Sequence, residues 1–325
     1  MGGLLARLRE SEAGARWVRE LAAVEVPEGG PVLPSAVELP QLLLDLTVPH
    51  AEVNGLLRLW DEVLGDAEWR WLLERCAAAV FTDPDVVGGG IRVPRLPEGL
   101  GPAGRWWAAL VFVMALPQAR ERHRARGIPE EVSRRTFADL GRQVAIHRLR
   151  QGTGGVNSPS WLGLHLRGEI FQLGRLQFQR SRLRAPWLPV AAGEASLALH
   201  LPDFLGPLSP AACEASLAQA RAFFPRHFPE EPCAVAHCES WLLDPQLGDY
   251  LPTGSNLLAF QNRFRLQPRP DRPNDEDPVR YVFNVADTDP ADLPRRTSLE
   301  RAVGDHLRAG HHWYGGQGWF PLHTL

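Results

Sequence analysis

The sequence predicts a mixed α/β protein in which a helical domain is followed by a β-sheet domain flanked by helices. In the first half, apolar residues recur at the 3.6-residue spacing of helices. In the second half, short alternating runs separated by turn residues and helical segments predict strands. A chain of 325 residues is long enough for two separate cores. We place the boundary at the glycine-rich stretch 151–157, which gives a mostly helical domain at 1–150 and a sheet domain at 151–325.

Four segments of the first half carry helical patterns. Gly65 and Asp66 separate the first two, which we expect to form an antiparallel pair. Residues 83–102 contain too many glycines and prolines for a helix, although 91–93 could form a short edge strand. The predicted helices comprise residues 49–64, 69–80, 106–114 and 129–152, the last of them opened by Pro129 and ended by Gly152.

The most clearly marked part of the second half is a strand, a turn, a helix and a second strand. A connection of this length makes the two strands parallel or splayed neighbours in a βαβ unit. Ser209 can cap the helix and Pro210 suits its first turn. The segments are a strand at 196–201, a turn at 202–208, a helix from Ser209 to about Phe224 and a strand at 233–243.

Further segments complete the predicted sheet and its flanking helices. Residues 161–183 alternate like sheet, with a bulge or tight turn at Gly174 and Arg175. Polar residues of this region, such as Gln177 and Gln179, could line an acceptor cleft or form an ordinary solvent face. The remaining predictions are a short helix entered at Ser255–Asn256, strands near Arg265, at 279–285 and at 311–322, and a helix from the capping box of Thr297 and Glu300 to Gly310.

Composition and charge exclude several classes of function. The net charge of −3 gives no case for binding nucleic acid or an anionic membrane. The chain contains no lysine, which removes Schiff-base chemistry and a phosphate-loop lysine. No apolar run of about 18 residues or signal-like start is present, so we expect a cytoplasmic protein. Four cysteines without CxxC spacing indicate neither disulfides nor zinc.

Two stretches carry a resemblance to a known superfamily. The run LALHLPDFLGPLSPAACEASLAQA resembles the central segment of the GNAT acyltransferases, where a strand meets a turn that cradles a pyrophosphate. SNLLAFQNRF resembles the last helix of that superfamily, with Asn256, Ala259 and Phe264 in the expected order. The whole chain resembles a two-domain bacterial acyltransferase family with a helical N-terminal domain and a GNAT-like C-terminal domain. This resemblance implies acyl-CoA or coenzyme A as a small-molecule co-substrate, with no permanently bound cofactor, and an unidentified amine as acceptor.

The resemblance also implies a set of donor-binding residues. Superfamily members usually carry Gln or Arg, two residues, Gly, one residue, then Gly or Ala in the phosphate turn. This chain has Asp203, Gly206 and Leu208 at those positions, and Asp203 opposes phosphate binding unless an arginine offsets its charge. The implied coenzyme A residues are Leu199, His200, Leu201, Gly206, Leu208, Ser209 and Asn256.

Candidate catalytic residues lie on the second strand of the βαβ unit and shortly after it. Alternation places His237 and Glu239 on one face, near the carboxyl end where α/β sites cluster. Transfer of an acyl group from a thioester to an amine requires a base for the ammonium and an acid for the leaving thiolate. We assign Glu239 as the base, with His237 beside it, and Tyr250 as the acid. Glu239 could alternatively form an ion pair with one of the arginines.

Two rival functions remain open at this point. In one, the same cleft binds a ligand or a partner without turnover, which the departures at Asp203 and Leu208 favour. In the other, Cys233 or Cys238 carries the acyl group covalently. We expect no metal site, because His306, His311 and His312 lack a carboxylate or cysteine at fixed spacing.

Overall fold

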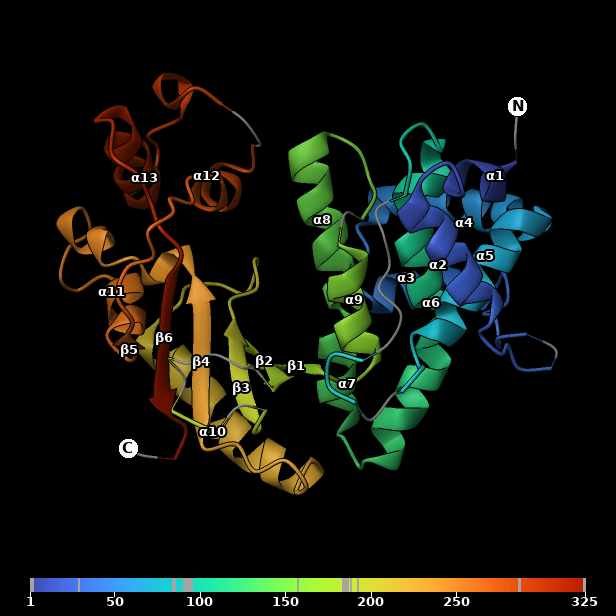
Figure 1. The fold of residues 1–325 in the computed structure, drawn as a ribbon, viewed down its shortest axis with the longest axis horizontal. Helices are drawn as coiled ribbons and strands as arrows, with labels where there is room; N and C mark the ends of the chain where they lie inside the picture. Colours follow the sequence, from blue (N-terminus) through green and yellow to red (C-terminus); the bar gives the residue numbers. More distant parts are fainter. Residues whose placement is uncertain are drawn as a thin grey trace. The chain divides into compact units, whose positions relative to one another are not determined.

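The computed structural model describes residues 3–28, 30–83, 86–89, 96–156, 158–182, 187, 189–191, 193–285 and 288–323. The chain divides into two compact units, Met1–Phe171 and Gln172–Leu325. The first is helical and the second holds most of a six-stranded mixed sheet (Figure 1). The predicted fold class is confirmed. The predicted edge strand at 91–93 lies outside the described residues.

The helical unit is built around one long helix. Residues 106–116 of α6 are buried on every side, because α4, α5, α7 and α9 all pack against this helix. Asp66 caps α5 by accepting hydrogen bonds from the N–H groups of Glu68 and Trp69, which separates α4 from α5 as predicted. The helices are α1 (Leu4–Leu8), α2 (Glu12–Ala22), α3 (Glu38–Asp45), α4 (His50–Gly65), α5 (Ala67–Ala79), α6 (Gly101–Ala125), α7 (Glu130–Phe137), α8 (Asp139–Gln151) and α9 (Pro159–Leu166).

The predicted helix at 129–152 is wrong in one respect, because it breaks at Ala138 into α7 and α8. The Thr47 hydroxyl donates to the carbonyl of Ala138, and the N–H of Gly141 donates to the carbonyl of Leu46. These tertiary hydrogen bonds occupy backbone groups that a continuous helix would pair internally. The predicted end is correct, since Gly152 closes α8 in the left-handed conformation at φ 68°.

The segment that begins the predicted sheet region at 161–183 is helical instead. Pro159 occupies the first turn of α9, and Leu162 and Leu166 share a buried face four residues apart. Since α9 packs on α6 and α7, it belongs to the helical unit. The units therefore divide after Phe171, further along the chain than the glycine-rich stretch 151–157.

The sheet has the strand order β1-β2-β3-β4-β6-β5. β3 and β4 are parallel, as the βαβ prediction requires, whereas β2–β3, β4–β6 and β5–β6 are antiparallel. Gly174 makes the predicted turn between the first two strands at φ 66°. The strands are β1 (Ile170–Leu173), β2 (Leu176–Ser181), β3 (Ser196–His200), β4 (Val235–Ser240), β5 (Arg265–Leu266) and β6 (Gly316–Pro321).

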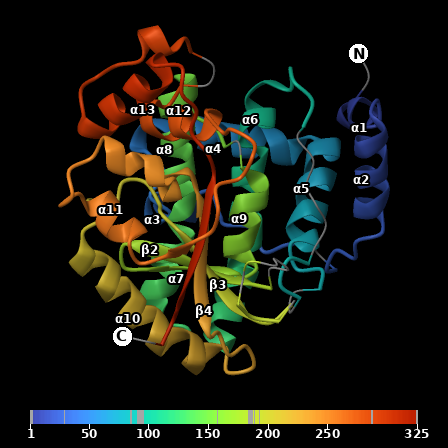
Figure 2. The same ribbon diagram turned by 60° about the vertical axis from the view of Figure 1, so that its left-hand side comes forward.

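Four α-helices accompany the sheet in the described part of the second unit. α10 joins β3 to β4, and α12 and α13 lie beyond the carboxyl end of β4 (Figures 1 and 2). The predicted strand at 279–285 is wrong, because Val279 and Phe283 bury one face of a helix that Asn284 ends in the left-handed conformation. The capping box of Thr297 and Glu300 is confirmed. The helices are α10 (Pro210–His227), α11 (Asn256–Gln261), α12 (Glu276–Phe283) and α13 (Ser298–Arg308).

Candidate active site

The central feature of the sheet unit is a gap in strand pairing. β3 and β4 pair only at Leu197 with Ala236 and at Ala198 with His237. Beyond these pairs, β3 continues to His200 and β4 to Ser240, each still paired on its other side with β2 and β6. The carboxyl ends of β3 and β4 therefore separate. Main-chain groups at a parted strand end can pair with a ligand, as in peptide strand addition.

The side chains at this opening divide between the two faces of the sheet. Phe178 on β2 contacts Phe224 on α10, with ring centroids 6.3 Å apart, which marks the face that α10 covers. Because Phe178 pairs with Leu199, alternation and register place Leu199 on that face. His200 and the two β4 candidates, His237 and Glu239, lie on the opposite face. The structure thus brings these three polar residues to one face of the opened strands.

The implied donor residues at the end of β3 and directly after it differ in their surroundings. Leu199 is buried at 2% exposure and Leu201 is half-buried. His200 is also half-buried, and its ring Nε2–H donates to the Gln179 Oε1 at 2.9 Å. Since the amide oxygen can only accept, the imidazole proton lies on Nε2 and Nδ1 is the basic nitrogen.

An arginine holds the turn at 202–208. Arg175 donates from Nε to the carbonyl of Gly206 and from Nη1 to that of Pro202, both at 2.9 Å. Gly206 has φ 76°, a conformation that glycine adopts without strain. The side chain of Leu208 is buried and belongs to the core. Arg175 therefore fixes the turn and places a positive charge beside it.

The N-terminus of α10 begins directly after this turn. Ser209 caps it, since its Oγ accepts from the N–H of Ala212 at 3.2 Å. Arg263 donates from Nη2 to the carbonyl of Pro210 at 3.3 Å and from Nη1 to Glu214 at 3.1 Å. A helix N-terminus flanked by guanidinium groups is a suitable site for a diphosphate. The residues present therefore fit the pyrophosphate of coenzyme A, despite the departures in the turn.

Asn256 lies at the start of the short helix α11. Ser255 is the cap of α11, since its Oγ accepts from the N–H groups of Leu257 and Leu258. Asn256 is the first residue inside this short helix. Its predicted contact with the coenzyme stays a prediction.

Glu239 and His237 occupy contrasting environments on β4. The Glu239 side chain is exposed, and its Oε2 accepts from the Gln317 Nε2 at 3.4 Å. His237 is buried at 4% exposure, and neither ring nitrogen has a hydrogen-bond partner among the described residues. Burial lowers the pKa of His237 to about 4, so its ring is neutral at pH 7. Trp187 approaches this ring edge-on, with centroids 6.0 Å apart.

Tyr250 is anchored to α13. Its hydroxyl donates to the His306 Nδ1 at 2.9 Å, because the His306 Nε2–H donates to the carbonyl of His312 at 3.0 Å. Burial, followed by the charges of Asp249 and Asp305, raises the pKa of Tyr250. The phenol is therefore protonated at neutral pH, as an acid must be.

Comparison with known proteins identifies the family. Residues 37–168 match the family described as N-acyltransferase N-terminal domain, and residues 170–320 match the GNAT-like C-terminal domain. An acyltransferase in complex with CoA and 10C-teicoplanin is 36% identical, with a TM-score of 0.90 over 98% of this chain and 99% of that one. The chain belongs to the two-domain N-acyltransferases.

Two further solved structures are also similar to this chain. One is an acyltransferase in complex with decanoyl-CoA and teicoplanin, with 37% identity and a TM-score of 0.89 over 98% of this chain and 99% of that one. The other is a mutant acyltransferase in complex with octanoyl-CoA, with 36% identity and a TM-score of 0.88 over the same shares. No curated protein matches the sequence. The chain is thus an acyltransferase whose co-substrate is an acyl-CoA thioester.

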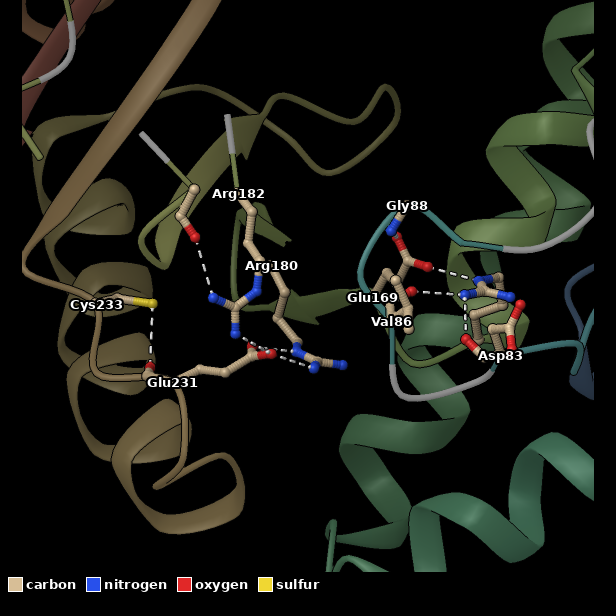
Figure 3. Close-up of polar contacts among 10 residues, drawn as sticks. Asp83, Val86, Gly88, Glu169, Arg180, Arg182, Glu231 and Cys233 are labelled. Atoms are coloured by element: carbon tan, nitrogen blue, oxygen red, sulfur yellow. Dashed lines mark hydrogen bonds and ion pairs between the residues drawn. The ribbon is translucent and has the colours of Figure 1, made fainter. Parts of the chain in front are cut away.

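The cysteines of the acyltransferase are poor candidates for a covalent carrier. All four are buried. Burial raises the pKa of Cys233 to about 11 and that of Cys238 to about 12, so both thiols are protonated at neutral pH. The Cys233 thiol donates to the carbonyl of Glu231 at 3.4 Å (Figure 3).

The described residues contain no group of three or more histidine, cysteine or acidic residues that could hold a metal ion. Among the same residues, no helix combines the length and apolarity needed to cross a membrane.

Sequence reasoning missed the arginines that prepare the turn and the helix start. Arg175 was predicted only to lie in a bulge or tight turn with Gly174, not to bind the turn at 202–208. Arg263 gave no local signal, because its contacts with Pro210 and Glu214 span about 50 residues of sequence.

Proposed function

We propose that this acyltransferase transfers a medium-length acyl group from acyl-CoA to an amine of a teicoplanin-like acceptor. The acceptor class is suggested by the similar acyltransferases, two of which are in complex with teicoplanin or 10C-teicoplanin. The observation within this chain that supports the proposal is the parted end of β3 and β4, which carries Glu239 on its exposed side.

The reaction we propose is direct attack within a ternary complex. The amine nitrogen attacks the thioester carbon, a C–N bond forms, and the C–S bond breaks as the coenzyme leaves as a thiolate. Glu239 accepts the proton that the nitrogen must lose, and Tyr250 supplies a proton to the thiolate. Main-chain N–H groups at the parted end of β3 stabilise the developing oxyanion.

His200 is a second candidate for the base. Its Nε2–H donates to Gln179, so the lone pair that a base requires is on Nδ1. His237 is less suited, since a pKa of about 4 makes it a weak proton acceptor.

The burial and raised pKa values of the cysteines support direct attack over a covalent carrier. Treatment of the folded protein with iodoacetamide should therefore leave the transfer rate unchanged. A rate that falls in step with alkylation of Cys233 or Cys238 would favour the carrier.

The acceptor is tested by incubating the protein with decanoyl-CoA and a teicoplanin core that bears a free amine. We expect mass spectrometry to detect an amide-linked decanoyl product together with one equivalent of free coenzyme A. Release of coenzyme A without this product, while decanoyl-CoA still binds, would show that the acceptor is wrong and the donor right.

A further inference from the structure

The helical unit holds an apolar cavity of about 190 Å³. Every described residue that lines it belongs to the unit Met1–Phe171, on α2, α5, α6 and α9 or in the short segments at 80, 88–89 and 167–169. A cavity of 150 Å³ lined by apolar side chains is known to bind benzene, so this one is large enough for a small apolar molecule. Its apolar lining includes Trp17, Ala79, Trp107, Val111, Leu162 and Leu166.

The charged groups at the cavity bind each other and the backbone. Arg167 donates from Nε to Glu169 at 2.6 Å, and its two terminal nitrogens donate to four carbonyls of residues 80–86 at 2.8–3.2 Å. Glu169 also accepts from the N–H of Gly88 at 3.1 Å (Figure 3). Since every nitrogen of this guanidinium already donates, the described lining residues offer no unpaired positive charge to an anionic ligand.

The indole N–H of Trp17, which also lines the cavity, differs from these paired groups. Trp17 is 2% exposed, and its indole Nε1–H has no acceptor among the described residues. A buried donor without a partner destabilises a protein, because it has lost its hydrogen bond to water. A ligand with an acceptor oxygen would remove this penalty, which a pure hydrocarbon could not do.

We propose that this cavity binds one uncharged aliphatic chain that carries a single acceptor oxygen, as a fatty alcohol does. The apolar lining selects the chain, the internally paired Arg167 and Glu169 exclude a carboxylate, and Trp17 selects the oxygen. The described lining residues all lie in the helical unit, and the site does not depend on the transfer reaction.

The chain offers a blocking variant and a matched control. Gly163 lines the cavity on α9, and a Cβ added there meets no atom within 4 Å. Gly163→Leu should therefore occupy ligand space without a backbone clash. Gly55 lies exposed on α4, where an added Cβ also meets nothing within 4 Å, so Gly55→Leu makes the same change away from the cavity.

The test is calorimetric titration of the full chain with octan-1-ol and with octanoate. We expect octan-1-ol to bind to the wild type and to Gly55→Leu alike, at least tenfold more tightly than octanoate. Gly163→Leu should lower the affinity for octan-1-ol at least tenfold, and Trp17→Phe should lower it severalfold. Equal affinity for Gly163→Leu and Gly55→Leu, or equal affinity for alcohol and carboxylate, would overturn the proposal.

A second measurement does not depend on how a variant folds. Crystals soaked in 8-bromooctan-1-ol should show anomalous bromine density within the cavity. Bromine density elsewhere, with none in the cavity, would overturn the proposal.

Discussion

The two ends of the β3–β4 pair differ in how their charged groups are used. Near the amino ends, Arg180 from β2 binds Glu231 through two hydrogen bonds of 2.8 Å, and both side chains are at most 6% exposed (Figure 3). The same guanidinium lies 4.3 Å from the ring centroid of Phe228. At the carboxyl ends the strands separate, and Glu239 faces solvent.

This difference explains how a sheet can open without losing its shape. The buried ion pair holds the segment before β4 against β2, so the separation is confined to the end where a ligand would enter. We call the amino ends of β3 and β4 the closed end and their separated carboxyl ends the open end. Charges at the closed end stabilise the structure, whereas those at the open end can act on substrates. The following predictions test that division of roles.

The largest effect should come from breaking the closed end. Glu231→Ala leaves Arg180 buried without its carboxylate, and should lower the free energy of unfolding by about 3–5 kcal/mol. Urea denaturation measures this loss. Glu276→Ala removes an exposed partner of Arg280 and should change the same quantity by less than about 1 kcal/mol. Similar losses for both variants would contradict a structural role for the closed end.

A change at the open end should affect rate instead of stability. Glu239→Gln should lower kcat about a hundredfold, since general-base catalysis contributes at least that much, with little change in unfolding. His200→Asn serves as the comparison. A hundredfold loss of kcat for His200→Asn, together with wild-type turnover for Glu239→Gln, would show that the base is His200 on β3 and not Glu239 on β4.

The turn should contribute to donor binding. Arg175→Gln removes the guanidinium that holds the carbonyls of Pro202 and Gly206, and should raise KM for decanoyl-CoA about tenfold with kcat nearly unchanged. Arg182→Gln, a half-exposed arginine of the closed end, should leave KM unchanged. Steady-state kinetics that rank these two variants the other way would refute the assigned diphosphate site.

The smallest predicted effect is a dependence of stability on pH. Burial lowers the pKa of His237 to about 4, so the folded chain binds fewer protons than the unfolded chain between pH 6.5 and 4. Stability should therefore fall as the pH is lowered through this range, by less than about 1.4 kcal/mol per pH unit from this residue. His237→Asn should reduce the slope of unfolding free energy against pH, and an unchanged slope would show that His237 does not titrate in this way.

Local signals in the sequence predicted much of the fold. The capping box of Thr297, the cap at Ser209 and the turn at Gly174 each depend on a few adjacent residues, and all three are confirmed. The strand predicted at 279–285 is wrong, because Val279 and Phe283 fit one face of a helix as well as they fit an apolar strand. The break at Ala138 depends on Thr47, which is distant in sequence.

The candidate site was harder to predict from the sequence, because it too depends on contacts between residues that are distant in the chain. Alternation correctly placed His237 and Glu239 on β4, but the loss of pairing after Ala198 depends on strand register. Neither Arg175 nor Arg263 is near α10 in sequence, so their contacts with the turn and with the start of α10 could not be predicted.

The central claim is that acyl-CoA binds at the parted ends of β3 and β4, and hydrogen–deuterium exchange with and without saturating decanoyl-CoA tests it most directly. Amides at 199–212 and 238–240 should exchange more slowly when the ligand is bound, because they gain hydrogen-bond partners or lose access to water. Those of β2 and β6, already paired in the sheet, should change little. Protection confined to other segments, at a ligand concentration that saturates the protein, would contradict the claim.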